Sequence, residues 1–193
     1  MHVVELCSAL QHAGFACLLV AGEVGASERD MRQLAVDRGL RLVDLPGLGR
    51  DIAPWGDIAS LVRLYRLMRR ERPDVVHTHL AKAGFIGRLA ARLARVPLVL
   101  HSSHGTIFQG YFSPGKARVF LLLERLGGRL STRIITSSES LRDDLVRLDV
   151  APADRIEVIP YGFEFDARAH QLRHSGAFRD SLGIPQDAPL VGA

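Results

Sequence analysis

The chain has 193 residues, of which 47% are hydrophobic and 24% are charged, and its formal net charge is +4 at pH 7. These proportions are typical of a globular protein with a buried core, and they exclude a chain that is disordered throughout. The positive charge is carried almost entirely by arginine, which suits phosphate and carboxylate partners. No lysine-rich run or aromatic-interleaved basic patch favours nucleic acid.

The cysteine content and the lengths of the apolar runs indicate in which cellular compartment the protein is expected. Cys7 and Cys17 each lie among apolar residues, with no second pair to complete a zinc pattern. We therefore expect two free thiols in a reducing compartment, which favours the cytoplasm. No uninterrupted apolar run reaches about 18 residues, so no membrane-spanning helix is expected.

The first part of the chain alternates between helical and extended patterns. The periodicity predicts a helix at 3–13, a strand at 16–22, a helix at 27–39 and a strand at 40–46. A long helix is then expected at 57–70. Its core-facing stripe is predicted to consist of Ile58, Leu61, Val62, Tyr65 and Met68, with the arginines outside it.

The alternation continues to the end of the chain. A strand at 74–80 is followed by a helix that begins at Gly84, with Arg88, Arg92 and Arg95 on its outer face. The later elements are expected as a strand at 96–103, a helix at 113–131, a strand at 133–138, a helix at 139–148 and a strand at 155–160. This order predicts an α/β fold in which an open parallel sheet carries helices on both faces, as in a Rossmann-like domain.

Both ends of the chain depart from that architecture. A doubly wound sheet normally opens on a strand, whereas this chain opens on a helix, and its final apolar segment stops as it begins. The sequence therefore predicts that a first strand and a following domain are absent; a complete, atypical domain is the alternative.

Histidines mark the end of the strand at 74–80. His77 and His79 point to the same face of that strand, and Lys82 follows in the turn. A metal site needs a further ligand, and no carboxylate is placed to supply it, so no metal is expected. We expect His77 to be a hydrogen-bonded core residue, and His79 and Lys82 to face a polar or anionic ligand at the start of the next helix.

The next strand end is also polar. Ser102, Ser103 and His104 are followed by Gly105, and small polar residues with a histidine suit hydroxyl recognition. A serine nucleophile is an alternative, but the strand lacks the GxSxG elbow of hydrolases. Ser103, His104 and Gly105 are therefore candidate substrate-binding residues.

Four segments in a fixed order resemble a known family: "RPDVVHTHLAKAGFIGRLAARLARVPLVLHSSHG", "GYFSPGKARVFLLLERL", "ITSSESLRDDLVRL" and "RIEVIPYGFEFD". Together they resemble the N-terminal domain of glycosyltransferase family 4, whose members are retaining, sugar-nucleotide-dependent enzymes with the GT-B fold. The bacterial transferases of surface-polysaccharide and lipid-linked glycan assembly look most similar. The resemblance implies a Rossmann-like acceptor-side domain at 1–170, lacking its first strand, and a linker at 171–193 that leads into a donor-binding domain.

The resemblance also implies roles for individual residues. His104 matches the histidine that faces the transferred sugar and hydrogen-bonds to it, His79 and Lys82 match cleft-lining positions, and Gly162 matches a glycine near the hinge. The sugar nucleotide is then the donor substrate, and no cofactor or metal is implied. Without its second domain the chain is expected to be inactive. A sugar-nucleotide epimerase of the same architecture and a non-catalytic binding module are the alternatives.

One helix raises the question of a membrane partner. Lys116 and Arg118 lie beside Val119, Phe120 and Leu123, after Phe112, and such a surface suits an anionic bilayer. An ordinary amphipathic helix with a solvated face explains the same pattern. The location expected is thus the cytoplasm, with peripheral binding at the inner membrane face as one form of it.

Overall fold

A computed structural model of the chain describes residues 2–23, 30–49, 53–105, 114–160, 177–185 and 188. The chain divides into two compact units, Met1–Pro160 and Tyr161–Ala193. The second unit contains α8 (Ala177–Ser181). Across the described residues, no helix combines the length and the apolar character that crossing a membrane requires.

The first four elements of the first unit are two helices and the two strands of a small parallel sheet. They are α1 (His2–His12), β1 (Leu18–Ala21), α2 (Arg32–Asp37) and β2 (Arg41–Asp44). β1 and β2 are parallel, and Val4, Ala35 and Leu40 form the buried cluster beneath them. The helix predicted at 27–39 is thus shorter at its end, and its predicted beginning lies outside the described residues.

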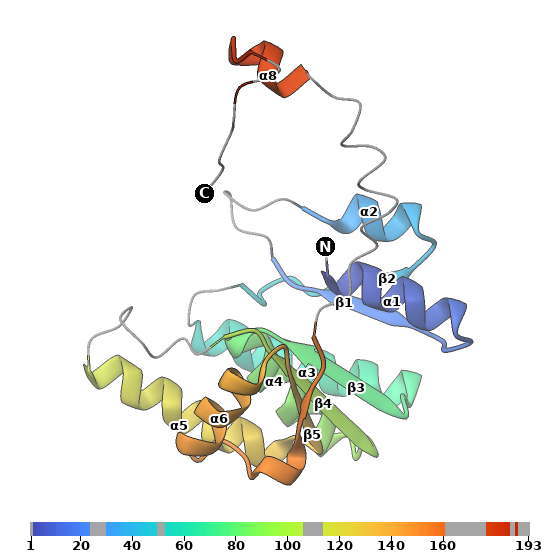
Figure 1. Cartoon of the computed structure of the whole chain (residues 1–193). Helices are drawn as coiled ribbons and strands as arrows, with labels where there is room; N and C mark the ends of the chain where they lie inside the picture. Colours follow the sequence, from blue (N-terminus) through green and yellow to red (C-terminus); the bar gives the residue numbers. More distant parts are fainter. Residues whose placement is uncertain are drawn as a thin grey trace. The chain divides into compact units, whose positions relative to one another are not determined.

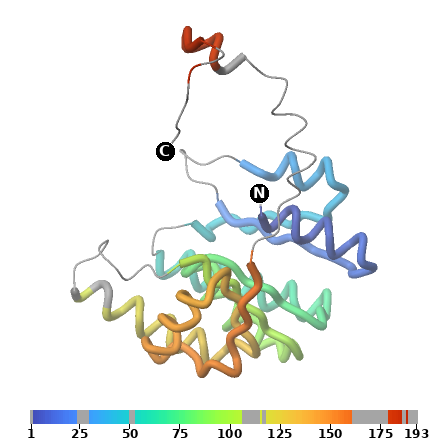
Figure 2. Tube along the Cα trace, in the orientation of Figure 1, coloured from blue at the N-terminus to red at the C-terminus, as the bar shows by residue number. Residues whose placement is uncertain are grey.

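The remaining elements of unit one form a four-stranded parallel sheet with its helices. They are α3 (Pro54–Glu71), β3 (Val75–His79), α4 (Ala81–Leu93), β4 (Leu98–Ser103), α5 (Pro114–Leu130), β5 (Arg133–Thr136), α6 (Glu139–Arg147), η1 (Ala153–Arg155) and β6 (Ile156–Val158). The strand order is β3-β4-β5-β6, and β3, β4 and β5 lie side by side in Figures 1 and 2. The predicted α/β fold with parallel strands is confirmed.

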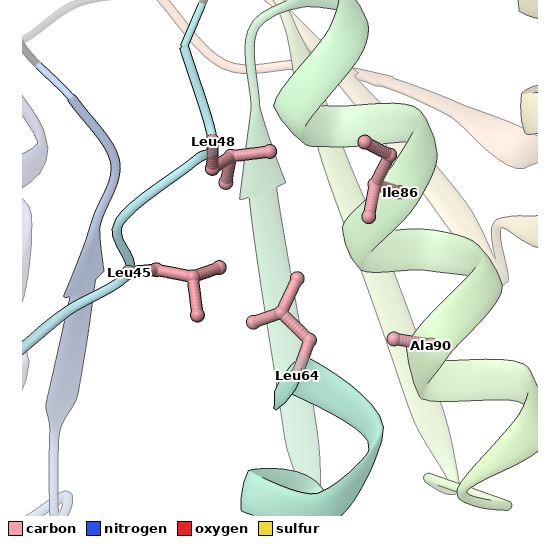
Figure 3. Close-up of a cluster of buried hydrophobic side chains, with 5 residues drawn as sticks. All are labelled: Leu45, Leu48, Leu64, Ile86 and Ala90. Carbon is pink, nitrogen blue, oxygen red and sulfur yellow. The ribbon is translucent and has the colours of Figure 1, made fainter. Parts of the chain in front are cut away.

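The strands fall into two sheets, where one continuous sheet was predicted. Among the described residues no ladder of hydrogen bonds joins β1 or β2 to β3. Side-chain packing connects them instead. Leu45 and Leu48, which follow β2, pack against Leu64 of α3 and against Ile86 and Ala90 of α4 (Figure 3).

Helices α4, α5 and α6 cover one face of the four-stranded sheet. Helix α4 packs on β3 and β4, with α3 on one side of it and α5 on the other. The close fit needs glycine: a Cβ at Gly87 would lie 2.9 Å from Cγ2 of Thr78 on β3. Ile134, Leu145 and Ile156 form the cluster that holds α6 to β5 and β6. Ser138 caps α6 by accepting a hydrogen bond from the Leu141 amide.

Helix α4 differs from its prediction in two ways. It begins at Ala81, so Lys82 lies in its first turn and not in a preceding loop. Leu80 makes the junction possible, because its backbone has φ 65° and ψ 162°, a region that is almost restricted to glycine. Arg88, predicted on the outer face, is fully buried between α4 and α5. Its charge is met by Glu124 of α5, at 3.7 Å between Nη2 and Oε2.

Helix α3 buries a different face from the one that was predicted. Ser60 and Leu64 are its buried residues, with Leu61 and Met68 packed beside them. Ile58, Val62 and Tyr65, predicted to face the core, are exposed. The helix therefore carries two apolar stripes, and the core takes the one that contains Leu61, Leu64 and Met68.

Candidate functional site

The carboxyl ends of β3 and β4 lie next to each other. The parallel register pairs His77 with Leu100 and His79 with Ser102. Successive side chains alternate between the two faces of a strand. His77 and His79 therefore share one face, while Thr78 is buried on the face that α4 covers.

Four histidines converge at this edge, and we refer to His2, His77, His79 and His104 as the imidazole cluster. The ring centroids of His77 and His79 are 4.4 Å apart, and the rings of His79 and His104 stack at 5.4 Å. His2, at the start of α1, approaches His104 and His79 edge-on, with ring centroids 6.0 and 6.4 Å away. The cluster thus joins α1, β3 and the segment after β4.

Hydrogen bonds fix the orientation of three of these rings. Nδ1 of His79 lies 3.1 Å from Nε2 of His104, and Nε2 of His77 lies 2.8 Å from Oγ of Ser102. A bond between two neutral imidazoles requires one nitrogen to carry the proton and the other to accept it. His79 is half-buried and His104 exposed, so His79 holds His104 at the solvent-facing side of the cluster.

Burial keeps His77, His79 and His104 uncharged at neutral pH. Desolvation, with smaller contributions from neighbouring histidines, lowers the pKa of His77 to about 4 and that of His79 to about 3. The pKa of His104 is also lowered, by desolvation first and then by His2. At neutral pH these rings therefore offer one hydrogen-bond donor and one acceptor each, without a positive charge.

A second buried group lies on the opposite face of β3 and β4. The hydroxyl of Thr78 donates to the carbonyl of Leu100, at 3.1 Å, and its oxygen lies 3.0 Å from Nδ1 of His101. Because Thr78 has a single hydroxyl proton, His101 must donate from Nδ1. Burial, and then the charge of Arg88, lower the pKa of His101 well below its usual value. This arrangement ties the ends of the two strands together beneath the imidazole cluster.

The lowered pKa values predict that acid destabilises the fold. Between pH 7 and 5 the unfolded histidines, with a pKa near 6.5, bind protons that the folded His77 and His79 do not, so stability falls as the pH falls. We expect the free energy of unfolding to fall by on the order of 2 kcal/mol for each of these two histidines over this range. Urea unfolding at each pH measures it. The H77N/H79N variant should show a flatter dependence, and an equal slope in both proteins would contradict the assignment.

The structure places the other predicted site residues in different surroundings. Lys82 forms an ion pair with Asp57 of α3, and both side chains are largely buried. Ser103 is half-buried and Gly105 is exposed, directly beside His104. Gly162 lies outside the described residues. His79, Ser103, His104 and Gly105 are therefore brought together, while Lys82 is held against α3.

Sequence reasoning missed His2. His2 lies about 75 residues before the other members of the cluster in the sequence. Its helix carries no cap or motif that marks it as a site residue. Only the folding of the chain, which places the start of α1 beside the end of β3, brings His2 close to His79 and His104. In the part of the chain that the structure describes, no group of three or more histidine, cysteine, aspartate or glutamate side chains is arranged to hold a metal ion.

Comparison with known families decides what kind of domain carries this site. The model of the glycosyl transferase 4-like domain matches residues 1–162. The chain belongs to this glycosyltransferase family. The match covers both sheets and the whole imidazole cluster, and it confirms the resemblance that the four segments indicated.

The curated relatives of this chain are named as glycosyltransferases. The UDP-Gal:alpha-D-GlcNAc-diphosphoundecaprenol alpha-1,3-galactosyltransferase of Escherichia coli is 31% identical over 153 residues, which are 79% of this chain and 40% of that protein. The capsular polysaccharide biosynthesis glycosyltransferase CapM of Staphylococcus aureus is 31% identical over 116 residues, 58% of this chain and 30% of that protein. The chain thus spans less than half the length of these relatives.

Solved structures support the fold. The Anabaena protein HepE, in complex with UDP and glucose, superposes with a TM-score of 0.66 over 94% of this chain and 45% of its own, at 16% identity. The UDP-GlcNAc 2-epimerase of Neisseria meningitidis, bound to UDP-GlcNAc, gives 0.65 over 96% of this chain and 51% of its own, at 17% identity. The domain therefore has the architecture found in both transferases and epimerases.

Proposed function

We propose that this chain is the acceptor-side domain of a retaining glycosyltransferase that moves a sugar from a sugar nucleotide to a glycan or lipid-linked acceptor in surface-polysaccharide assembly. The imidazole cluster carries the proposal, because His77, His79 and His104 place hydrogen-bonding but uncharged groups at the carboxyl edge of a parallel sheet, where ligands of such sheets bind. The activities of the relatives from Escherichia coli and Staphylococcus aureus support it.

His104 is the proposed catalytic residue. Its exposed ring can donate a hydrogen bond to a hydroxyl of the transferred sugar, and this bond can strengthen as charge develops in the transition state. His79 acts as a positioning residue, because its hydrogen bond at 3.1 Å orients the His104 ring. Being half-buried and neutral, His79 can hold that orientation without repelling a cationic, oxocarbenium-like sugar.

The neighbouring residues complete the proposed acceptor side. Ser103 and Gly105 line the substrate next to His104, with the glycine leaving open space around its backbone. Lys82, already paired with Asp57, contributes at the cleft wall, and Gly162 lies near the hinge. No cofactor or metal is required beyond the sugar nucleotide. The reaction is proposed to take place in the cytoplasm, at the inner membrane face where a lipid-linked acceptor would be held.

The 193-residue chain alone is not expected to transfer sugar. Transition-state stabilisation in a two-domain cleft needs both walls, and this chain spans 40% of the Escherichia coli relative. The product of the complete reading frame is therefore the protein to assay, with UDP-sugars and lipid-diphosphate acceptors. Turnover by the 193-residue chain itself would show that the reaction does not need a second domain, and would contradict the proposal.

The role of His104 gives the test of the proposal. In the product of the complete reading frame, H104A is expected to lower kcat by about 100-fold while changing KM for the donor little, because the lost hydrogen bond forms mainly in the transition state. The matched control is H12Q, which removes an exposed histidine at the far end of α1. Equal activity of H104A and H12Q would show that His104 is not a catalytic residue.

Product analysis separates this proposal from an epimerase, which shares the fold. A retaining transferase consumes donor only when acceptor is present, and the new glycosidic bond keeps the anomeric configuration of the donor in the NMR spectrum. Conversion of UDP-GlcNAc to its C2 epimer without acceptor would instead favour the epimerase. Inversion at the anomeric carbon would contradict the retaining mechanism alone.

A further inference from the structure

Helix α3 carries an apolar stripe that faces solvent. Trp55, Ile58, Val62 and Tyr65 are 85%, 53%, 38% and 38% exposed. Their spacings of three, four and three residues place them along one line of the helix, and we refer to them as the α3 stripe. The buried residues of the helix, Ser60 and Leu64, lie on the opposite side and pack toward α4.

Positive charge runs beside the α3 stripe. Arg63, Arg66 and Arg70 are exposed along one flank of it, and Arg69 continues its line one turn after Tyr65. The two carboxylates of the helix are already engaged: Asp57 pairs with Lys82, and Glu71 pairs with Arg41 and Arg70. Within the described residues neither Arg66 nor Arg69 has an ion-pair partner, so their charges are available to an external anion.

The chemistry of the α3 stripe matches a bilayer interface. An aromatic residue with a polar group stands at each end of the stripe, Trp55 with its indole N–H and Tyr65 with its hydroxyl, and such residues favour the level of the lipid headgroups. Aliphatic Ile58 and Val62 lie between them. A helix with an apolar line and an arginine-rich flank is the kind that lies in the plane of an anionic membrane.

A basic hollow continues the surface at the end of α3. It has a volume of about 310 Å³, and its lining includes Arg69, Arg72 and Arg95 together with one acidic residue, Asp74. The excess of guanidinium groups suits a phosphate-bearing headgroup. Arg69 belongs both to the line of the α3 stripe and to the hollow, so one bound lipid surface can reach both.

We propose that the α3 stripe and its flanking arginines dock this protein on an anionic lipid bilayer. A second copy of the chain fits less well, since an antiparallel two-fold pairing of this face would bring its arginine row beside the same row of the other copy. Lipid phosphates complement that row instead. The surface differs from the one that the sequence indicated on α5, where Phe120 and Leu123 are only partly exposed and Phe112 lies outside the described residues.

The placement of α3 links this surface to the candidate site. Asp57, in the first turn of α3, pairs with Lys82, which lies three residues after His79. A membrane-bound α3 would therefore hold the imidazole cluster close to the lipid surface. This consequence, unlike the docking itself, rests on the proposed function, because it matters only if the acceptor is lipid-linked.

Trp55 provides a direct test, because it is the only tryptophan of the chain. Its emission is expected to shift to shorter wavelength when the 193-residue chain meets vesicles of phosphatidylcholine with about one quarter phosphatidylglycerol. Vesicles of phosphatidylcholine alone should leave it nearly unchanged, and about 0.5 M NaCl should reverse most of the shift. Co-sedimentation with the same vesicles measures the affinity.

Matched variants assign the effect to this helix. I58N/V62N and R66Q/R69Q are each expected to weaken binding to the anionic vesicles by about tenfold or more. The control is V119N/L122N, which removes two comparably exposed apolar residues from α5 and should bind like the unmodified chain. Circular dichroism checks that each variant is folded.

Unchanged Trp55 emission with anionic vesicles, or equal loss in the α5 control, would overturn the proposal. So would self-association in sedimentation velocity that the α3 variants abolish while vesicle binding is absent. These outcomes are independent of catalysis, since no substrate is present. Failure of the transferase assay with vesicle binding intact would count against the proposed function and leave the docking surface in place.

Discussion

Replacement of Arg88 by alanine is expected to lower the free energy of unfolding by about 3–5 kcal/mol, because it leaves a buried charge without its partner. Arg88 is fully buried, and its guanidinium faces Glu124 at 3.7 Å. Its Nε donates to the carbonyl of Gly84, but Nη1 and Nη2 have no hydrogen-bond partner within the described residues. The pair therefore depends on charge attraction and packing more than on hydrogen bonds.

The double variant R88M/E124L separates these contributions. Replacing a buried pair by apolar residues of similar volume is often neutral, so we expect this variant to lie within about 1 kcal/mol of the unmodified chain. R92A is the matched control on the same helix, because Arg92 is exposed and bonds only through its Nε to the Leu130 carbonyl among the described contacts. Urea unfolding measures all three. An R88A loss no greater than that of R92A would contradict the buried-pair assignment.

Replacement of Gly128 by alanine is expected to cost about 3 kcal/mol, since overpacking against backbone cannot be relieved by a change of rotamer. Gly128 is a buried residue of α5, and a Cβ there would overlap the carbonyl oxygen of Val150 and lie 2.9 Å from its carbonyl carbon. Val150 belongs to the cluster of Ile134 and Leu145, so α5 would have to move away from the sheet.

Gly115 supplies the control within the same helix. A Cβ at Gly115 meets nothing within 4 Å, so G115A should keep the fold and gain up to about 1 kcal/mol from the better helix propensity of alanine. Thermal unfolding followed by circular dichroism compares the two variants. A loss in G115A as large as that in G128A would mean that α5 tolerates no alanine, and that the contact with Val150 is not the cause.

Most of the fold could be predicted from hydrophobic periodicity. The strands that end in His79 and Ser103 were expected within two residues of where they lie, because short apolar runs between helices leave few alternatives. Periodicity could not decide which face of α3 is buried, since both the line of Leu61, Leu64 and Met68 and the line of Ile58, Val62 and Tyr65 are apolar. Only the docking of α3 against α4 distinguishes them.

The candidate site was only partly predictable. His79 and His104 could be found because each lies at the carboxyl end of a strand, and parallel strands end at the same edge of a sheet. The burial of Arg88 could not be found, because an arginine in a helix is normally solvent-facing and its partner Glu124 lies 36 residues later. His2 escaped for a similar reason, since its contact depends on the path of the chain between α1 and β3.

Leu80 has a consequence for how this junction tolerates change. Its backbone conformation, φ 65° and ψ 162°, costs on the order of 1–3 kcal/mol for a residue with a Cβ, and its side chain is largely exposed. Glycine would relieve this cost, yet it would also free the one residue between His79 and helix α4. Thermal stability and a fixed imidazole geometry therefore compete at a single position. A variant of this protein selected only for heat resistance would be drawn to glycine here, at the expense of the ordered edge that the candidate site requires.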